Sequence, residues 1–203
     1  MFKCDTVTAQ SAFLLDCCGP AGPRIVNFQG MQMQAEMLLT PKIDAMRVEL
    51  RQWRAEDFPA YAAYYADPET AQYVGGVKDA QAAWRHLASL IGHWALRDFG
   101  VWAVEDKETG RLIGCVGFWM PENWPQLEMP FWFLSDAYES GLAAEALRAA
   151  LDYGRRRFAD IEFETYIPIG AEAANALAAR AGGRRDGVID LFDFGEHAVF
   201  KWR

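Results

Sequence analysis

An aromatic, strand-like run passes almost directly into an alanine-rich helix in the second half of the chain. The run is "FWFL" (residues 131–134), and the helical pattern extends from Leu142 to Phe158. Between them stands "SDAYESG", a turn of small and polar residues. The first N–H groups of a helix lack intrahelical acceptors and carry the positive end of its dipole, so this turn suits an anion. A glycine that only closes a strand-to-helix turn explains the same pattern, and both interpretations stay open.

The elements expected around this stretch alternate irregularly between strands and helices. Apolar alternation and turn residues predict strands at 46–53, 101–105, 112–119, 127–134 and 161–167, with a final pair within 187–202. Helical spacing predicts helices that begin near residues 54 and 79, and two more over 142–158 and 171–181. This order predicts an α+β (mixed α/β) domain with one central, mostly antiparallel twisted sheet flanked by about four helices.

Two local predictions concern strand pairing and helix burial. Pro130 has no N–H to donate, so the strand over 127–134 is expected to bulge or to stop pairing there. The helix with Asp79 as its N-cap is expected to bury one stripe of side chains. The stripe comprises Ala83, Trp84, Leu87, Leu90, Ile91 and Trp94.

Length, charge and hydropathy limit the classes of function. The chain of 203 residues, 52% apolar, is long enough for one well-packed domain. Its net charge of −8 argues against a protein that neutralises nucleic-acid phosphates. No segment approaches the roughly 20 apolar residues of a membrane span, and the N-terminal region does not fit a secretory signal. We therefore expect a cytoplasmic protein that binds neither nucleic acid nor membrane.

The four cysteines and three histidines do not have the spacing of a zinc site, so no metal is expected. Residues 1–45 are rich in turns, glutamine and methionine and show no sustained period. We interpret them as a poorly ordered N-terminal extension of a domain over 46–203. A start codon at one of the later methionines is the alternative.

Several long segments of the chain resemble the GNAT family of N-acetyltransferases, most closely its RimJ/RimL-type branch. The similarity runs from about Arg47 to Arg203 and includes "LRQWRAEDFPAYAAYYADPETAQYVGG", "GVWAVEDKETGRLIGCVGFW" and "DAYESGLAAEALRAALDYG". The resemblance implies that two strands splay apart and that the pantetheine arm of acetyl-CoA inserts between them. It also implies acetyl transfer from acetyl-CoA to a primary amine, either a protein N-terminus or a small molecule. The chain could act as a homodimer.

The resemblance also assigns residues to acetyl-CoA. Phe133 and Leu134 match positions that offer main-chain groups to pantetheine. The pyrophosphate positions are Glu139, Ser140, Gly141, Leu142 and Ala143, and Asn175 is a further cofactor candidate. The family pattern is not kept throughout, because Glu139 replaces a glycine and Ser140 replaces a basic or amide residue. Ala171 and Ala174 replace the usual Asn and Ser, and Asn175 lies one position late.

Two residues are candidates for the proton transfers of acetyl transfer. An alkylamine is protonated at neutral pH, so a carboxylate can help to remove its proton. Glu128 matches a glutamate that this branch carries near the acceptor amine, although a solvent-facing glutamate on an alternating strand is the alternative. Tyr138 could return a proton to the leaving thiolate, or simply pack in the core. Trp119 and Trp124 bracket the loop "MPENWPQ" and belong either to the core or to an acceptor pocket.

Two functions of different classes therefore follow. The first is an acetyl-CoA-dependent N-acetyltransferase. The second is a protein of the same fold whose cofactor site is eroded at Glu139, Ser140, Ala171 and Ala174, and which acts as a non-enzymatic binding module. Backbone N–H groups do most of the work in phosphate binding and survive side-chain replacement, which favours the enzyme.

Overall fold

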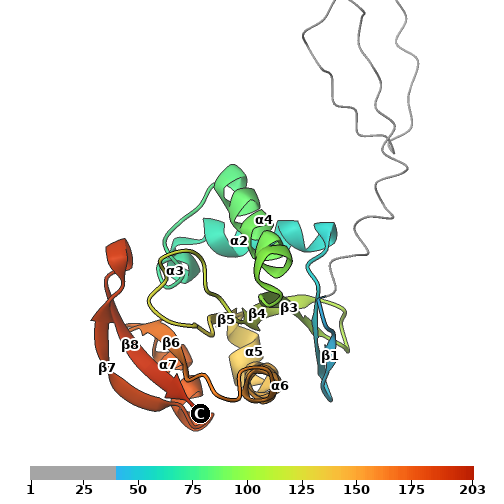
Figure 1. The fold of residues 1–203 in the computed structure, drawn as a ribbon. Helices are drawn as coiled ribbons and strands as arrows, with labels where there is room; N and C mark the ends of the chain where they lie inside the picture. Colours follow the sequence, from blue (N-terminus) through green and yellow to red (C-terminus); the bar gives the residue numbers. More distant parts are fainter. Residues whose placement is uncertain (1–39) are drawn as a thin grey trace, which may run out of the picture. The chain divides into compact units, whose positions relative to one another are not determined.

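The strands of the protein form two antiparallel sheets (Figure 1). The computed structural model describes residues 40–203, except the side chain of Asp193. The first sheet has the order β1-β2-β3-β4-β5 and the second has the order β6-β8-β7. The strands are β1 (Ile43–Asp44), β2 (Val48–Arg51), β3 (Val101–Asp106), β4 (Leu112–Gly117), β5 (Phe131–Phe133), β6 (Phe163–Pro168), β7 (Arg184–Asp190) and β8 (Glu196–Trp202).

Helices cover both faces of the first sheet. α2 and α4 lie on one face, and α5 and α6 lie on the other, while α7 packs beside the second sheet (Figure 1). The helices are α2 (Phe58–Ala66), α3 (Pro68–Ala71), α4 (Ala80–Arg97), α5 (Ser135–Glu139), α6 (Leu142–Arg157) and α7 (Glu172–Arg180). Two short 3-10 turns are η2 (Ala55–Asp57) and η3 (Phe192–Phe194). The predicted helices are present, and α3 and α5 are additional short ones.

The expected α+β class is confirmed, but the expected single sheet is divided between β5 and β6. These two strands are edge strands of their own sheets, and Glu128, in the segment that leads into β5, forms an isolated parallel bridge with Glu164 of β6. At the bridge Met129 N–H donates to the Glu164 carbonyl at 2.6 Å, and Glu164 N–H donates to the Leu127 carbonyl at 2.9 Å. Pro130 follows directly and cannot donate. The strands then diverge, as the predicted break at Pro130 requires.

Helix α4 begins where the sequence predicts. Asp79 is its N-cap, and the carboxylate accepts a hydrogen bond of 2.7 Å from Ala82 N–H. The buried apolar stripe runs along one face and consists of Ala83, Leu87, Leu90 and Trp94. The prediction for Trp84 is wrong, because its side chain is 60% exposed. Each residue turns the helix by about 100°, so Trp84 stands beside the stripe formed by its neighbour Ala83.

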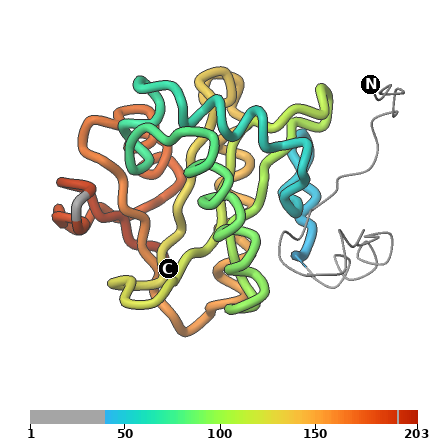
Figure 2. The backbone as a smooth tube through the Cα atoms, turned by 90° about the horizontal axis from the view of Figure 1, so that it is seen from above, coloured from blue at the N-terminus to red at the C-terminus, as the bar shows by residue number. Residues whose placement is uncertain are grey.

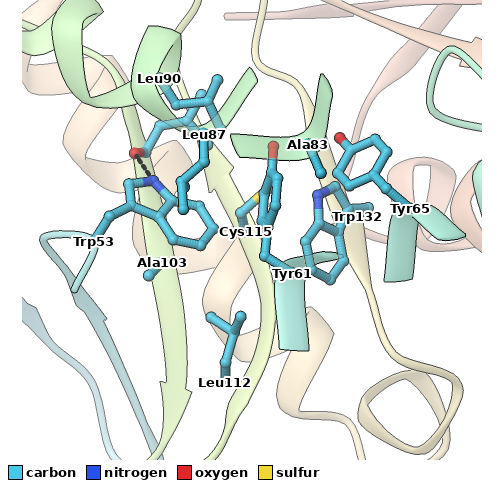
Figure 3. Close-up of a cluster of buried hydrophobic side chains, with 11 residues drawn as sticks. Trp53, Tyr61, Tyr65, Ala83, Leu87, Leu90, Ala103, Leu112, Cys115 and Trp132 are labelled. Carbon is cyan, nitrogen blue, oxygen red and sulfur yellow. Dashed lines mark hydrogen bonds between the residues drawn. The ribbon is translucent and has the colours of Figure 1, made fainter. Parts of the chain in front are cut away.

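Aromatic side chains join α2 to the first sheet. Tyr61 and Tyr65 pack with Trp132 against Cys115, on the face that α2 and α4 cover (Figure 3). Tyr64 stacks on Trp132 with ring centroids 3.8 Å apart. Aromatic pairs of this kind add about 0.5–1.5 kcal/mol beyond the burial of their area. α2 is therefore fixed to β5 at the edge where the two sheets separate.

The domain boundary predicted at residue 45 stays a prediction. Residues 1–39 lie outside the described residues, and Ile43–Asp44 pair with β2 as strand β1. Within residues 40–203, no helix combines the length and the apolar character needed to cross a membrane.

Candidate functional site

The facing edges of β5 and β6 form a gap between the two sheets. β5 pairs with β4 on its inner side, where Leu134 N–H donates to the Ile113 carbonyl at 2.9 Å. Alternate residues of an antiparallel strand bond to the same neighbour, so Phe131 and Phe133 turn their N–H and C=O groups toward the outer edge. Phe133 thus turns main-chain groups away from β4, and a contact of these groups with a cofactor stays a prediction. Leu134 does not offer its N–H, because β4 takes it.

The junction of α5 and α6 presents backbone N–H groups. Gly141 is the N-cap of α6 and adopts a φ of 78°, which a glycine tolerates without strain. The first helical bond runs from Glu145 N–H to the Gly141 carbonyl at 3.2 Å. The N–H groups of Leu142, Ala143 and Ala144 precede it and have no intrahelical acceptor. Free N–H groups at a helix start suit an anion, and the binding of a pyrophosphate here stays a prediction.

Glu139 and Ser140, two of the predicted pyrophosphate residues, do not lie in an open loop. Ser140 N–H donates to the Asp136 carbonyl at 3.0 Å, which closes the last turn of α5. Glu139 ends α5 and its side chain is exposed. The sequence predicted an open loop here, whereas the backbone of Glu139 is helical. Ser140 N–H is thus engaged within the protein, and Leu142 and Ala143 remain the N–H donors among the predicted residues.

Arg47 fixes this junction and was not identified from the sequence. Its backbone N–H donates to Glu145 Oε1 at 2.6 Å, and its Nε donates to Glu145 Oε2 at 2.9 Å. Its Nη1 donates to the Ser140 carbonyl at 3.1 Å. The guanidinium therefore ties the start of β2 to both sides of the turn at Gly141. A partner 98 residues away leaves no local signal in the sequence.

Asn175 holds the backbone at the start of α7. Its Nδ2 donates to the carbonyls of Pro168, at 3.0 Å, and Ala171, at 2.9 Å. Pro168 is the last residue of β6, so the carboxamide fixes the end of this strand to the following helix. A contact from Asn175 to a cofactor stays a prediction.

Glu128 lies in the wall of a cavity of about 630 Å³ that opens where β5 and β6 separate. Its side chain is only 6% exposed. Burial disfavours the charged carboxylate and raises the pKa of Glu128 to about 8. The interpretation of Glu128 as a solvent-facing residue is therefore wrong, and its carboxyl group can both hold and release a proton near neutral pH.

Trp119 and Trp124 both line the same cavity, and Trp119 also packs against the hydrophobic core, while a role of either in an acceptor pocket stays a prediction. Trp119 pairs with Glu128 through two backbone hydrogen bonds of 2.8 and 3.0 Å. The indole Nε1 of Trp124 donates to Glu128 Oε2 at 2.7 Å. This bond favours the carboxylate and opposes part of the rise in pKa that burial causes.

His93 supports this wall from behind. Met120 N–H donates to His93 Nε2 at 3.1 Å, and the ring stacks on Trp119 with centroids 4.5 Å apart. His93 Nδ1 then donates to the Phe99 carbonyl at 2.7 Å. Burial lowers the pKa of His93, so the ring stays neutral and keeps Nε2 as an acceptor.

Tyr138 is not among the residues that line the cavity with Glu128. It lies on α5, where its ring packs edge-on against Phe133 with centroids 5.8 Å apart. Burial raises the pKa of its hydroxyl group. Proton donation by Tyr138 stays a prediction, and its position beside Phe133 places it near the open edge of β5.

Tyr166 is a cavity residue that the sequence did not indicate. Its hydroxyl group donates to Glu164 Oε2 at 2.8 Å, and Glu164 is the bridge partner of Glu128. Lys201 Nζ lies 3.5 Å from Glu164 Oε1. Glu164 thus contacts both Tyr166, in the cavity wall, and Lys201, on the second sheet.

Cys115 also lines the cavity, and burial raises the pKa of its thiol, which keeps the sulfur protonated. Among the described residues, no cluster of three or more His, Cys, Asp or Glu side chains is arranged to hold a metal ion.

The chain is similar to known acetyltransferases along most of its length. Residues 47–184 match the family model described as the Acetyltransferase (GNAT) domain. The uncharacterized protein YkkB of Bacillus subtilis (strain 168) is 30% identical over 152 residues, which cover 70% of this chain and 84% of YkkB.

Two solved structures illustrate the likeness of fold. An acetyltransferase from Agrobacterium tumefaciens str. C58 superposes with a TM-score of 0.72 and 26% identity, over 80% of this chain and 94% of that one. RimL, a ribosomal L7/L12 alpha-N-protein acetyltransferase in complex with coenzyme A, has a TM-score of 0.66 and 16% identity, over 80% and 97% of the chains. With the match over residues 47–184, these findings show that the chain belongs to the GNAT family of acetyltransferases.

Proposed function

We propose that the protein transfers an acetyl group from acetyl-CoA to a primary amine in the cytoplasm, with Glu128 as the general base. The observation that carries the proposal is the position of Glu128. Its carboxyl group is buried beside the bridge at which the two sheets separate, and its pKa of about 8 suits proton removal from an alkylammonium ion. A general base whose pKa lies near the working pH is partly deprotonated at that pH and is still basic enough to remove a proton from the substrate.

The backbone around the gap fits acetyl-CoA. The outer edge of β5 offers the N–H and C=O of Phe131 and Phe133 to an extended ligand, in the manner of an added strand. The N–H groups of Leu142 and Ala143 suit a diphosphate at the start of α6. RimL, which shares the fold, has been solved with coenzyme A. The replaced side chains at Glu139 and Ser140 do not remove these backbone donors.

The chemistry divides between the cosubstrate and the chain. Acetyl-CoA supplies an acyl group activated as a thioester. Glu128 takes the proton of the ammonium group, after which the amine nitrogen forms a bond to the acyl carbon and the carbon–sulfur bond breaks. A backbone N–H at the edge of β5 can stabilise the negative charge that develops on the acyl oxygen. The thiolate leaves and gains a proton, for which Tyr138 beside Phe133 is our candidate donor. The nitrogen is cationic after the attack, and its second proton restores the Tyr138 hydroxyl group.

Calorimetric titration with acetyl-CoA, followed by a thiol-release assay with primary amines, tests the proposal. We expect micromolar binding and amine-dependent release of CoA. Glu128→Gln keeps an acceptor for the Trp124 indole and should bind acetyl-CoA normally, while turnover falls by a factor of about 10² or more. Folded protein that binds no acetyl-CoA would instead support the non-enzymatic module.

A further inference from the structure

We propose that the acceptor is a small amine whose body is an aromatic ring, held with its nitrogen at Glu128. The inference rests on the proposed function and specifies its substrate class. Three observations support the inference: the side chains that line the cavity, the two segments that approach each other beside it, and the charges near it.

The cavity wall around Glu128 is dominated by aromatic rings. They come from segments far apart in the sequence, and those used in the argument are Tyr73, Trp119, Trp124, Phe131, Tyr166 and Phe194. Aromatic faces and edges bind another ring by offset or edge-on packing, worth about 0.5–1.5 kcal/mol per pair beyond the area buried. A flexible polar chain gains much less from such walls.

Two segments that contribute residues to the cavity wall approach each other. The loop between α3 and α4 and the tip of the β7–β8 hairpin lie on the same side of the molecule (Figure 2). The ring of Phe194, at this tip, lies so near Gly75 that a Cβ added there would stand 3.2 Å from it. Phe192 packs against Trp124 with ring centroids 5.4 Å apart. The hairpin therefore contributes the ring of Phe194 to the cavity wall, and Phe192 supports Trp124, another ring of that wall.

Few charges face the cavity beside Glu128. His86 Nδ1 and the Tyr61 hydroxyl group form a hydrogen bond of 2.8 Å. Burial lowers the pKa of His86 to about 4, so its ring is neutral. Lys78 lies over the ring of Tyr65 and donates to the Gly75 carbonyl at 3.2 Å, which engages its ammonium group. His197 donates Nδ1–H to the Gly195 carbonyl at 2.7 Å. A second charge on the acceptor would thus lose its hydration without gaining a partner ion.

Rates of CoA release with three matched amines test the inference. The probes are 2-phenylethylamine, 1,5-diaminopentane and the tripeptide Ser-Ala-Ala. We expect kcat/KM for 2-phenylethylamine to exceed the other values by about tenfold or more, which corresponds to about 1.4 kcal/mol. Transfer to the tripeptide or the diamine at an equal or greater kcat/KM would overturn the aromatic assignment while leaving the proposed function intact.

Two alanine variants test whether the ring of the bound amine lies beside Phe194. Phe194→Ala should raise the KM for 2-phenylethylamine by about tenfold and leave the KM for acetyl-CoA unchanged, because Phe194 lines the cavity assigned to the acceptor. Trp84→Ala, at an exposed aromatic residue of α4, is the control and should change neither value. Equal KM values for the amine in both variants would contradict the inference.

If no amine is acetylated, the binding of 2-phenylethylamine still tests the aromatic acceptor separately from the proposed acetyl transfer. Quenching of tryptophan fluorescence by 2-phenylethylamine, weakened in Phe194→Ala, would support the aromatic cavity even though transfer had failed. No quenching in the parent protein would overturn the inference.

Discussion

The indole N–H of Trp124 donates a hydrogen bond of 2.7 Å to Glu128 Oε2, across a loop of three residues. Burial raises the pKa of this carboxyl group, and the hydrogen bond from the indole opposes part of that rise. The net pKa is about 8. The bond is charge-assisted when Glu128 is ionised, so it favours the form that can accept a proton. In the proposed reaction, Trp124 would therefore position Glu128 and set the pH range over which Glu128 accepts a proton.

The first prediction concerns the pH dependence of the rate. Because a general base works in its deprotonated form, kcat/KM should rise with pH and level off above about 8. Trp124→Phe removes the indole donor and should move this rise to higher pH by about one to two units, as expected for a lost charge-assisted bond. Initial rates between pH 6 and pH 10 would measure both profiles. Superimposable profiles would contradict this role of Trp124.

The second prediction concerns stability. The pKa of Glu128 in the folded protein, about 8, lies above its ordinary value of 4.5, so the folded state keeps a proton that the unfolded chain has released between these values. The free energy of unfolding should therefore fall as the pH rises through this window, by at most about 1.4 kcal/mol per pH unit.

Glu128→Gln cannot titrate and should lack this part of the pH dependence. Urea unfolding of both proteins at about pH 5 and about pH 8 should show the variant gaining stability relative to the parent at the higher pH. His86 titrates identically in both proteins, so its effect cancels in the comparison. An unchanged difference between the two pH values would show that Glu128 has an ordinary pKa.

The order of the elements could be predicted because alternation, helical spacing and turn residues are local. Pro130 also predicted the end of strand pairing correctly, since its missing N–H is a property of the residue itself. Trp84 shows the limit of such patterns, because an error of one position on a helix changes a buried side chain into one that is 60% exposed.

The site could be predicted only where the family resemblance supplied positions. The resemblance gave Glu128 its assigned role, but its burial depends on a bridge to Glu164 and on the loop that carries Trp124. Arg47 and Tyr166 were missed because their roles come from tertiary contacts that no local spacing encodes. The helical backbone at Glu139 was missed for the same reason, since α5 is too short to show a period.

The third prediction tests whether Glu139 impairs the proposed diphosphate site. Its exposed carboxylate ends α5, two residues before Gly141, where it would repel a diphosphate. Glu139→Gln should tighten acetyl-CoA binding by about twofold to fivefold in a buffer of low ionic strength, and the gain should shrink at about 0.5 M salt. Calorimetry with Glu56→Gln as a control compares Glu139 with another exposed glutamate, on η2. Equal gains in both variants would indicate a general effect of net charge.

The fourth prediction concerns two glycines in helices, which differ in what surrounds them. A Cβ at Gly154 of α6 would stand 2.3 Å from Phe118 Cζ and 3.1 Å from Phe163 Cζ, whereas a Cβ at Gly92 of α4 would meet nothing within 4 Å. Gly154→Ala should therefore lower the free energy of unfolding by about 1–3 kcal/mol through overpacking. Gly92→Ala should raise it by about 0.5–1 kcal/mol, because alanine loses less backbone entropy in a helix.

Thermal and urea unfolding of the two variants measure these changes side by side. Since both substitutions replace glycine by alanine in a helix, the gain from helix propensity is common to them, and the difference reports the contact of α6 with the aromatic core. Equal stabilisation by both would mean that Phe118 moves aside without cost.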